Sequence, residues 1–249
     1  MKHWPLWLVP LIAGVAFAGI WAADANRSLF LVLNALGPMT SDWLWANITV
    51  LGDALVAFAL CLPLWRRRPD LLWAFVFVAL LGTAWVHGFK PLLDVPRPPA
   101  VLGDAVHVIG PAYKAGSFPS GHATTAFAIG GLLALGLRAR WLVVLIVGVA
   151  TLVALSRAVV GVHWPLDILA GVFGGWLCAV AGLWIGRRTA HFGARPPVQW
   201  ALGAFLAACA LALVFGHDKS GYPQADFLQH AIGICCLAAA AARLKRAAA

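Results

Sequence analysis

The sequence is poor in charged residues. Only 11% of its 249 residues are Asp, Glu, Lys or Arg, whereas 62% are hydrophobic, and the mean hydropathy is +0.87. Since soluble domains contain about 25% charged residues, this composition excludes an ordinary soluble domain. All nine acidic residues are Asp and none is Glu, for which we have no physical explanation. The sequence also lacks internal repeats and, apart from an Ala-rich C-terminal stretch, low-complexity tracts.

Cysteine is scarce as well. The five cysteines all fall within long apolar runs, at Cys61, Cys178, Cys209, Cys235 and Cys236. This placement is typical of small buried side chains, and it excludes a disulfide framework or a cysteine-based metal site.

Long apolar runs are abundant. Each is about 17 to 23 residues long, enough to cross about 30 Å of hydrocarbon as a helix. The eight runs lie at 4–23, 47–65, 71–89, 122–137, 141–161, 164–186, 198–216 and 227–242. We therefore predict an all-α, polytopic integral membrane protein with about eight spans. The first run also resembles a signal peptide, because Lys2 and His3 precede it and small residues end it.

The 18 basic residues are distributed unequally across the predicted membrane. With the N terminus inside, the twelve inner residues are Lys2, Arg66, Arg67, Arg68, Arg138, Arg140, Arg187, Arg188, Arg195, Arg243, Lys245 and Arg246. The six outer residues are Arg27, Lys90, Arg97, Lys114, Arg157 and Lys219. This asymmetry follows the positive-inside rule and predicts that both termini are cytoplasmic. It also explains the net charge of +9 without a nucleic-acid partner, and we expect none.

Two connections and one glycine pair stand out. Residues 28–45 are too short to span the membrane, and their apolar positions suit a helix lying at the interface, although a plain connecting loop fits equally well. Residues 90–121 form the longest outer connection, and their six prolines exclude a continuous helix. The GxxxG spacing of Gly171 and Gly175 predicts close helix packing.

Three polar stretches emerge on the predicted outer side, at 90–97, 120–122 and 157–167. They contain three of the six outer basic residues, Lys90, Arg97 and Arg157. Charged groups at a membrane are costly unless they are paired or solvated, so three cations at one rim indicate an anion site. Phosphate fits best, because its oxygens match guanidinium and ammonium donors.

The stretch FPSGHATTAF at 118–127 has the pattern of a helix start, with Ser120 at or near the N cap. The backbone N–H groups of Gly121 and His122 are then placed to bind a phosphate. An ordinary helix cap would explain these residues better if they stood alone.

His163 and Asp167 are four residues apart, so they share one helix face. Asp167 can fix the tautomer of His163 and leave the other ring nitrogen free to attack phosphorus. His122 is then the candidate that protonates the leaving oxygen and later activates water to hydrolyse the phosphohistidine. Helix capping by His163 and Asp167 is one alternative. A metal site formed by these three residues is another, but the three nearby cations would repel a divalent ion.

These residues resemble the three motifs of the type 2 phosphatidic acid phosphatase (PAP2) superfamily, which are K-x6-R-P, P-S-G-H and S-R-x5-H-x3-D. They read here as KPLLDVPRP at 90–98, PSGH at 119–122 and SRAVVGVHWPLD at 156–167. The resemblance covers about residues 47–186 and implies a six-helix core. Residues 187–249 are then additional transmembrane helices of a single membrane domain, 1–249.

The resemblance implies a metal-independent phosphatase without a cofactor, in which His163 is the nucleophile, Asp167 orients it and His122 is the acid and base. It implies phosphate binding by Lys90, Arg97, Ser120, Gly121 and Arg157. The expected substrate is a lipid phosphate or diphosphate: undecaprenyl diphosphate first, then phosphatidate, phosphatidylglycerol phosphate or lipid A. A bacterial member would lie in the inner membrane with its site facing the periplasm, and we see no sign of an obligate protein partner. A phosphotransferase with the same site stays open, as does a lipid transporter or flippase, which fits eight spans with charged residues at membrane depth.

Overall fold

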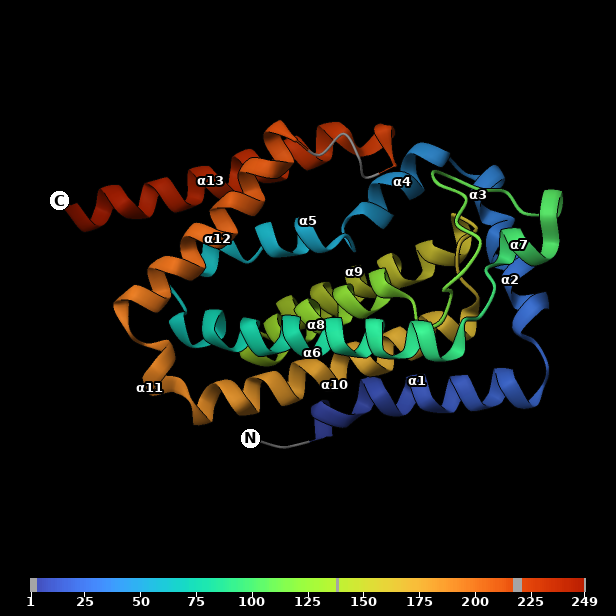
Figure 1. The fold of residues 1–249 in the computed structure, drawn as a ribbon, viewed down its shortest axis with the longest axis horizontal. Coiled ribbons are helices and arrows are strands. Elements are labelled where there is room, and N and C mark those ends of the chain that lie inside the picture. Colours follow the sequence, from blue (N-terminus) through green and yellow to red (C-terminus); the bar gives the residue numbers. More distant parts are fainter. Residues whose placement is uncertain (1–3, 138, 217–220, 249) are drawn as a thin grey trace.

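The computed structural model describes residues 4–137, 139–216 and 221–248, and within these ranges the chain is all-α with no β-strand. Most of the long helices run along the long axis of an elongated bundle (Figure 1). The predicted fold class is thus confirmed. Some residues used above for orientation or for the signal-peptide alternative lie outside the described ranges, namely Lys2, His3, Arg138 and Lys219, as do the side chains of Lys245 and Arg246.

Seven of the eight predicted runs are single helices. These are α1 (Trp4–Ala22), α6 (Pro69–Leu93), α8 (Gly121–Gly136), α9 (Arg140–Val159), α10 (Pro165–Arg188), α12 (Pro196–Phe215) and α13 (Asp226–Ala248). Proline stands in the first turn of α6, α10 and α12, where its missing N–H leaves no hydrogen bond unmade.

The protein is a multi-pass membrane protein. By length and composition, five of its described helices can cross a membrane, or up to seven if each of two bent helix pairs counts as one span. The helix α8, with 16 residues, is shorter than this criterion requires. It packs among α6, α9 and α10 in the centre of the bundle (Figure 1). Helices on the outside expose large apolar side chains, as lipid-facing helices do, including Ile12 and Val15 on α1 and Val144 on α9.

The predicted continuous span over 47–65 is wrong. This stretch contains the end of α4 (Asp42–Val50), α5 (Ala54–Ala59) and a short 3-10 helix, η1 (Leu62–Leu64). The chain bends by 55° between α4 and the segment formed by α5 and η1. The physical reason is Asp53, whose carboxylate accepts a hydrogen bond of 2.8 Å from the Leu55 N–H and so caps a new helix.

The stretch 28–45 is neither one interfacial helix nor a plain loop. It contains most of α2 (Asn26–Asn34), all of α3 (Leu36–Met39) and the start of α4. The chain turns by 110° between α1 and the pair α2 and α3, so these helices do not form one straight span. Phe30 and Asn34 of α2 are buried, which shows that α2 packs against the bundle.

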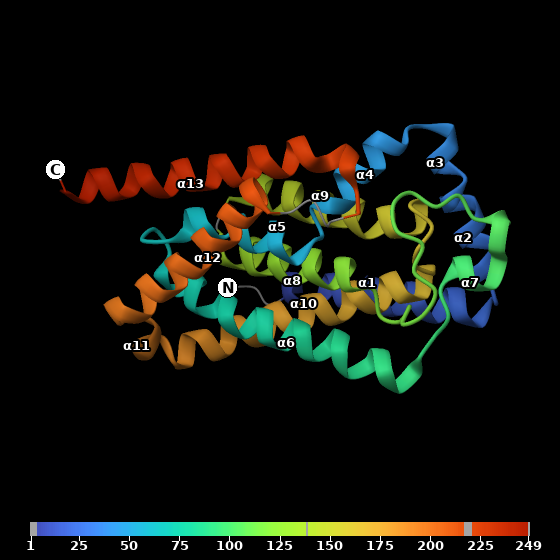
Figure 2. The same ribbon diagram turned by 45° about the horizontal axis from the view of Figure 1, so that its top comes forward.

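The ends of the bundle differ. The connection between α6 and α8 carries α7 (Pro98–Leu102) and the 3-10 helix η2 (Gly103–Ala105), and it lies at the same end as α2 and α3 (Figures 1 and 2). The short helix α11 (Ala190–Gly193) lies at the opposite end of the bundle. The start of α1 and the end of α13 both lie toward that end.

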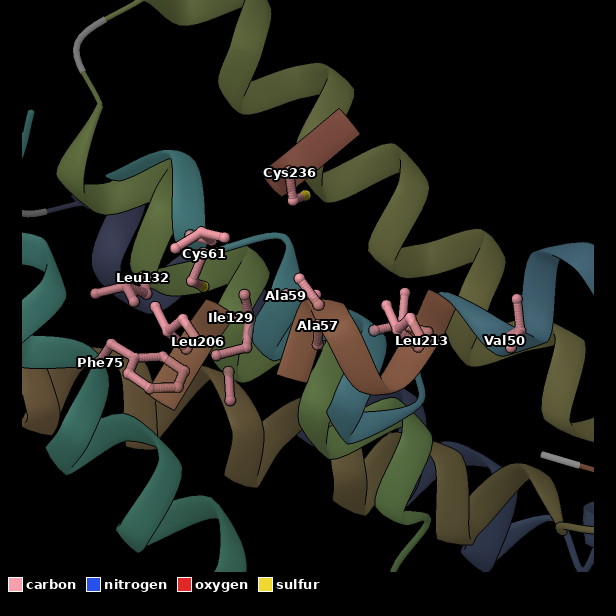
Figure 3. Close-up of a cluster of buried hydrophobic side chains, with 14 of the residues drawn as sticks. Val50, Ala57, Ala59, Cys61, Phe75, Ile129, Leu132, Leu206, Leu213 and Cys236 are labelled. Carbon is pink, nitrogen blue, oxygen red and sulfur yellow. The ribbon is translucent and has the colours of Figure 1, made fainter. Parts of the chain in front are cut away.

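The last two helices share a core with the helices that carry the motifs. One buried cluster contains Cys61, Phe75, Leu132, Leu206, Leu213 and Cys236 (Figure 3). These side chains come from five parts of the chain, including α6, α8, α12 and α13. All five cysteines are free, and all but Cys235 are buried, in keeping with their predicted role as small apolar side chains.

Candidate active site

Two glycines of α10 bring the start of α8 close to the start of α10. A Cβ on Gly171 would lie 2.7 Å from the carbonyl oxygen of Ser120, and one on Gly175 would collide with the carbonyl oxygen of Thr124. The predicted close packing at this GxxxG pair is therefore confirmed. Next to it, the Ser120 N–H donates a hydrogen bond of 3.0 Å to the carbonyl oxygen of Asp167. The second and third motifs thus adjoin each other.

His163 lies in the connection between α9 and α10, and Asp167 lies in the first turn of α10. His163 Nδ1 is 3.4 Å from Asp167 Oδ2, and both side chains are 3% exposed. The same carboxylate oxygen accepts hydrogen bonds from Ser117 Oγ at 2.5 Å and from the Trp164 N–H at 2.8 Å. Asp167 is therefore held on the Nδ1 side of the imidazole.

Arg97 lies on the other side of the same ring. Its Nη1 is 3.4 Å from His163 Nε2 and donates a 3.2 Å hydrogen bond to the Val162 carbonyl. Its Nε donates to the Ala115 carbonyl at 2.9 Å. Because a guanidinium only donates, the Nε2 that faces it carries a lone pair, and the ring proton lies on Nδ1 toward Asp167. This is the tautomer required of a nucleophilic Nε2.

The pKa of His163 lies well below its ordinary value of 6.5. Burial is the largest cause, followed by the positive charges of Arg97, Arg157 and Lys90, with His122 adding to the effect. The imidazole is therefore neutral at physiological pH. The same interactions show that residues from all three motifs act electrostatically on one ring.

The remaining residues of the first two motifs also lie at this end of the bundle. Lys90, in the last turn of α6, donates a hydrogen bond from Nζ to the Gly116 carbonyl. Ser120 is the N cap of α8 as predicted, and its side chain accepts a hydrogen bond from the Ala123 N–H. Gly121 is the first residue of α8.

Arg157 is held by two hydroxyl groups. Its Nη1 donates to Thr49 Oγ1 at 2.5 Å and to the Tyr222 hydroxyl at 3.1 Å. The side chain is 3% exposed, yet Nε has no hydrogen-bond acceptor among the described residues. A buried guanidinium N–H without an acceptor costs free energy, so this donor has a strong preference for an added oxygen ligand.

His122 and Gly121 line a cavity of about 270 Å³ between α5, α6 and α8. The other walls are mainly apolar and include Phe58, Val78, Ala79, Val86, Ala128 and Ile129. The helix break between α4 and α5 borders this cavity beside His122, because a Cβ on Gly52 would lie 3.0 Å from His122 Cβ.

Sequence reasoning missed the polar side chains that support the motif residues. Ser117 contacts Asp167, while Thr49 and Tyr222 contact Arg157. None of the three belongs to a motif, and Tyr222 is 65 residues from Arg157. Within the described part of the chain, no three His, Cys, Asp or Glu side chains are grouped closely enough to hold a metal ion.

Comparison with known proteins identifies a family domain in the central part of the chain. Residues 71–190 match the PAP2 superfamily. The chain carries a PAP2 superfamily domain.

Three similar proteins support this assignment. The putative undecaprenyl-diphosphatase YbjG of Escherichia coli is 28% identical over 176 residues, which cover 68% of this chain and 86% of that one. The undecaprenyl-diphosphatase of Sulfolobus acidocaldarius is 29% identical over 185 residues, covering 70% and 87%. The crystal structure of Aquifex aeolicus LpxE superimposes with a TM-score of 0.60 at 29% identity, covering 64% and 94%. The protein is an enzyme, a PAP2-type phosphatase.

Proposed function

We propose that this phosphatase hydrolyses a membrane lipid phosphate or diphosphate, with undecaprenyl diphosphate as the first candidate, through a phosphohistidine formed on His163. One observation carries the proposal: a neutral, buried imidazole lies between the Asp167 carboxylate and the Arg97 guanidinium. A nucleophile held by a carboxylate and facing a cation suits attack on an anionic phosphorus centre.

The reaction has two steps. In the first, the lone pair of His163 Nε2 attacks the terminal phosphorus, the bond from phosphorus to the leaving oxygen breaks, and His122, which takes up a proton when the anionic substrate binds, gives that proton to the leaving oxygen. In the second, His122 takes a proton from water, which attacks phosphorus and breaks the N–P bond, releasing inorganic phosphate. For a lipid monophosphate the leaving group is the lipid alcohol, and for a diphosphate it is the lipid monophosphate.

The phosphoryl oxygens are bound by the cations around His163. Arg97, Lys90 and Arg157 supply positive charge, and Arg157 also offers its Nε–H as a donor. The start of α8 at Ser120 and Gly121 supplies backbone N–H groups. Bound phosphate would offset the electrostatic repulsion among these three cations, and it would supply the acceptor that Arg157 Nε lacks among the described residues.

The cavity beside His122 supports a lipid substrate. Its apolar walls lie between helices of the bundle, and two further lining residues, Thr83 and His87, are exposed on α6. A lipid tail can therefore lie against α5, α6 and α8 while its phosphate reaches the motif residues. Undecaprenyl diphosphate comes first because the two relatives named for it are covered over 86% and 87% of their own lengths.

We further propose that the protein lies in the cytoplasmic membrane with the site on the outer side. The motif residues gather at the end of the bundle opposite α11. Arg187, Arg188 and Arg195 lie close to α11 in the chain. The positive-inside rule puts that basic end in the cytoplasm.

Phosphate release tests this function. The purified protein would be assayed with undecaprenyl diphosphate, phosphatidate, phosphatidylglycerol phosphate and lipid A, alongside His163→Ala and the control His191→Ala on α11. We expect release from at least one lipid, a loss of about 10³-fold or more in His163→Ala, and no change in the control. A wild-type protein no faster than His163→Ala on every lipid would contradict the proposal.

Two further measurements address the mechanism. A lipid labelled with ³²P in its terminal phosphate should leave an acid-labile, alkali-stable label on the wild-type protein and none on His163→Ala. A chelator should leave the rate unchanged. A rate that a chelator abolishes and one divalent metal restores would overturn the metal-independent mechanism.

A further inference from the structure

The helices after the matched region reach back to the candidate site. Tyr222 lies in the connection between α12 and α13, outside the PAP2 match at 71–190. Its side chain is buried, and its hydroxyl accepts the 3.1 Å hydrogen bond from Arg157 Nη1. A residue that no motif contains is thus in direct contact with a motif arginine.

The contact fixes one edge of the guanidinium. Nη1 carries two hydrogens, and Thr49 of α4 and Tyr222 supply one acceptor oxygen each. The Nε–H lies on the other edge of the same rigid plane, and no described residue accepts from it. Holding Nη1 in place therefore sets the direction of Nε–H.

Both acceptors are hydroxyl groups. A hydroxyl holds a guanidinium without neutralising its charge, whereas a carboxylate at the same place would offset the charge and compete with phosphate. The partners of Arg157 thus hold it in position and leave its positive charge available to an anion.

Tyr222 is itself firmly placed. A Cβ on Gly110 would lie 2.6 Å from its Cε1, so the ring packs directly on the backbone of the outer connection. Two residues further along the chain, the carbonyl oxygen of Gln224 accepts a 3.2 Å hydrogen bond from Asn47 of α4. Tyr222 and Thr49 therefore belong to two elements that are tied to each other.

We propose that Tyr222 is a positioning residue for phosphate binding, and that α12 and α13 are part of the active-site scaffold because Tyr222 lies in the connection between them. Tyr222 acts through Arg157 and does not touch the substrate. This inference rests on the proposed role of Arg157 as a phosphate ligand.

The test measures binding of orthovanadate, a phosphate mimic without a lipid tail, by isothermal titration calorimetry. Tyr222→Phe removes only the hydroxyl group, and Thr49→Val removes the other acceptor with little change in shape. We expect the Kd for orthovanadate to rise about tenfold in each, as for a lost hydrogen bond to a charged group. The control is Thr151→Val on α9, the helix that carries Arg157. The Thr151 hydroxyl bonds the Val147 carbonyl, and this variant should bind orthovanadate like the wild type.

A double-mutant cycle separates positioning from a general loss of structure. In an Arg157→Lys background, which lacks Nη1, Tyr222→Phe should change the Kd by less than about twofold, because the residues act as one unit. An equal effect in both backgrounds overturns the inference, and so does an unchanged Kd in Tyr222→Phe. If Tyr222→Phe lowers thermal stability, Thr49→Val repeats the cycle from α4.

Failure of this inference and failure of the proposed function give different results. A wild-type protein that releases no phosphate from any lipid contradicts the proposed function. A wild-type protein that releases phosphate and binds orthovanadate, with Tyr222→Phe indistinguishable from it in both, contradicts only the role of Tyr222.

Discussion

Ser117 donates a 2.5 Å hydrogen bond to the Asp167 oxygen that faces His163. Ser117 is fully buried, and its Oγ is also 3.5 Å from His163 Nδ1. The carboxylate that orients the imidazole is therefore itself oriented by a residue outside the motifs.

The first prediction concerns this hydrogen bond. Ser117→Ala should lower kcat by about tenfold, because loss of one hydrogen bond to a charged group costs about 1.5 kcal/mol or more. Steady-state phosphate release would measure the change. Ser28→Ala, which removes an exposed hydroxyl bonded to the Ala25 carbonyl, should behave like the wild type. Equal kcat values for Ser117→Ala and the wild type would show that Asp167 needs no such support.

The second prediction concerns the packing of α8 on α10. Gly175→Ala should destabilise the protein by about 1 to 3 kcal/mol and lower activity, because the added methyl group collides with the backbone of α8 below Ser120 and His122. The matched control is Gly148→Ala on α9, where a Cβ meets no atom within 4 Å. That variant should be neutral or slightly stabilising, since Ala favours a helix more than Gly. Thermal unfolding in detergent checks both, and similar melting temperatures for the two variants would contradict the packing described here.

The pH dependence of stability gives a third prediction. The pKa of His163 is lowered in the folded protein, so below pH 6.5 the unfolded chain binds a proton that the folded protein excludes. Stability from this residue is present above the ordinary pKa and is lost as the pH falls below it. The melting temperature should thus fall between pH 7.5 and 5.5, and fall less in His163→Gln than in the wild type. His191→Gln on α11 serves as the control, and parallel curves for the wild type and His163→Gln would contradict the prediction.

A fourth prediction concerns buried Asn34, which joins α2 to the outer connection. Its Nδ2 donates to the carbonyls of His107 and Val159, and its Oδ1 accepts from the His107 N–H. Asn34→Ala leaves these backbone groups without partners and should speed hydrogen exchange at residues 103–117, which lie next to the Arg97 site. Thr151→Val, which removes an exposed hydroxyl on α9 that bonds the Val147 carbonyl, should leave exchange at 103–117 unchanged. Unchanged exchange in Asn34→Ala as well would show that α2 does not restrain this connection.

The sequence sufficed for the helices and for the gathering of the motif residues. Apolar runs reveal spans because a bilayer requires them, and the motif spacings put His163 and Asp167 on one face. The break at Gly52 and Asp53 was missed because averaged hydropathy hides a single capping residue within an apolar run. A glycine followed by an N-cap residue was the available signal.

The supporting contacts could not be predicted in the same way. Ser117 lies in an irregular connection without periodicity, so no pattern indicates where its side chain points. Tyr222 reaches Arg157 only after two further helices have packed against α5 and η1. Such contacts depend on tertiary packing, which the spacing of residues along the chain does not encode.

The hydrogen bond between Arg157 and Tyr222 has a consequence for biosynthesis. All three motifs have been translated once synthesis reaches residue 167. Tyr222, which supplies the second hydroxyl that holds Arg157, lies 65 residues after Arg157 in the chain. With the roles proposed above, a nascent chain contains every reactive group before both hydroxyl groups that hold Arg157 are present, and we expect full phosphatase activity only once α12 and α13 are inserted. Cutting the gene after α10 would yield a protein with intact motifs and a loosely held arginine.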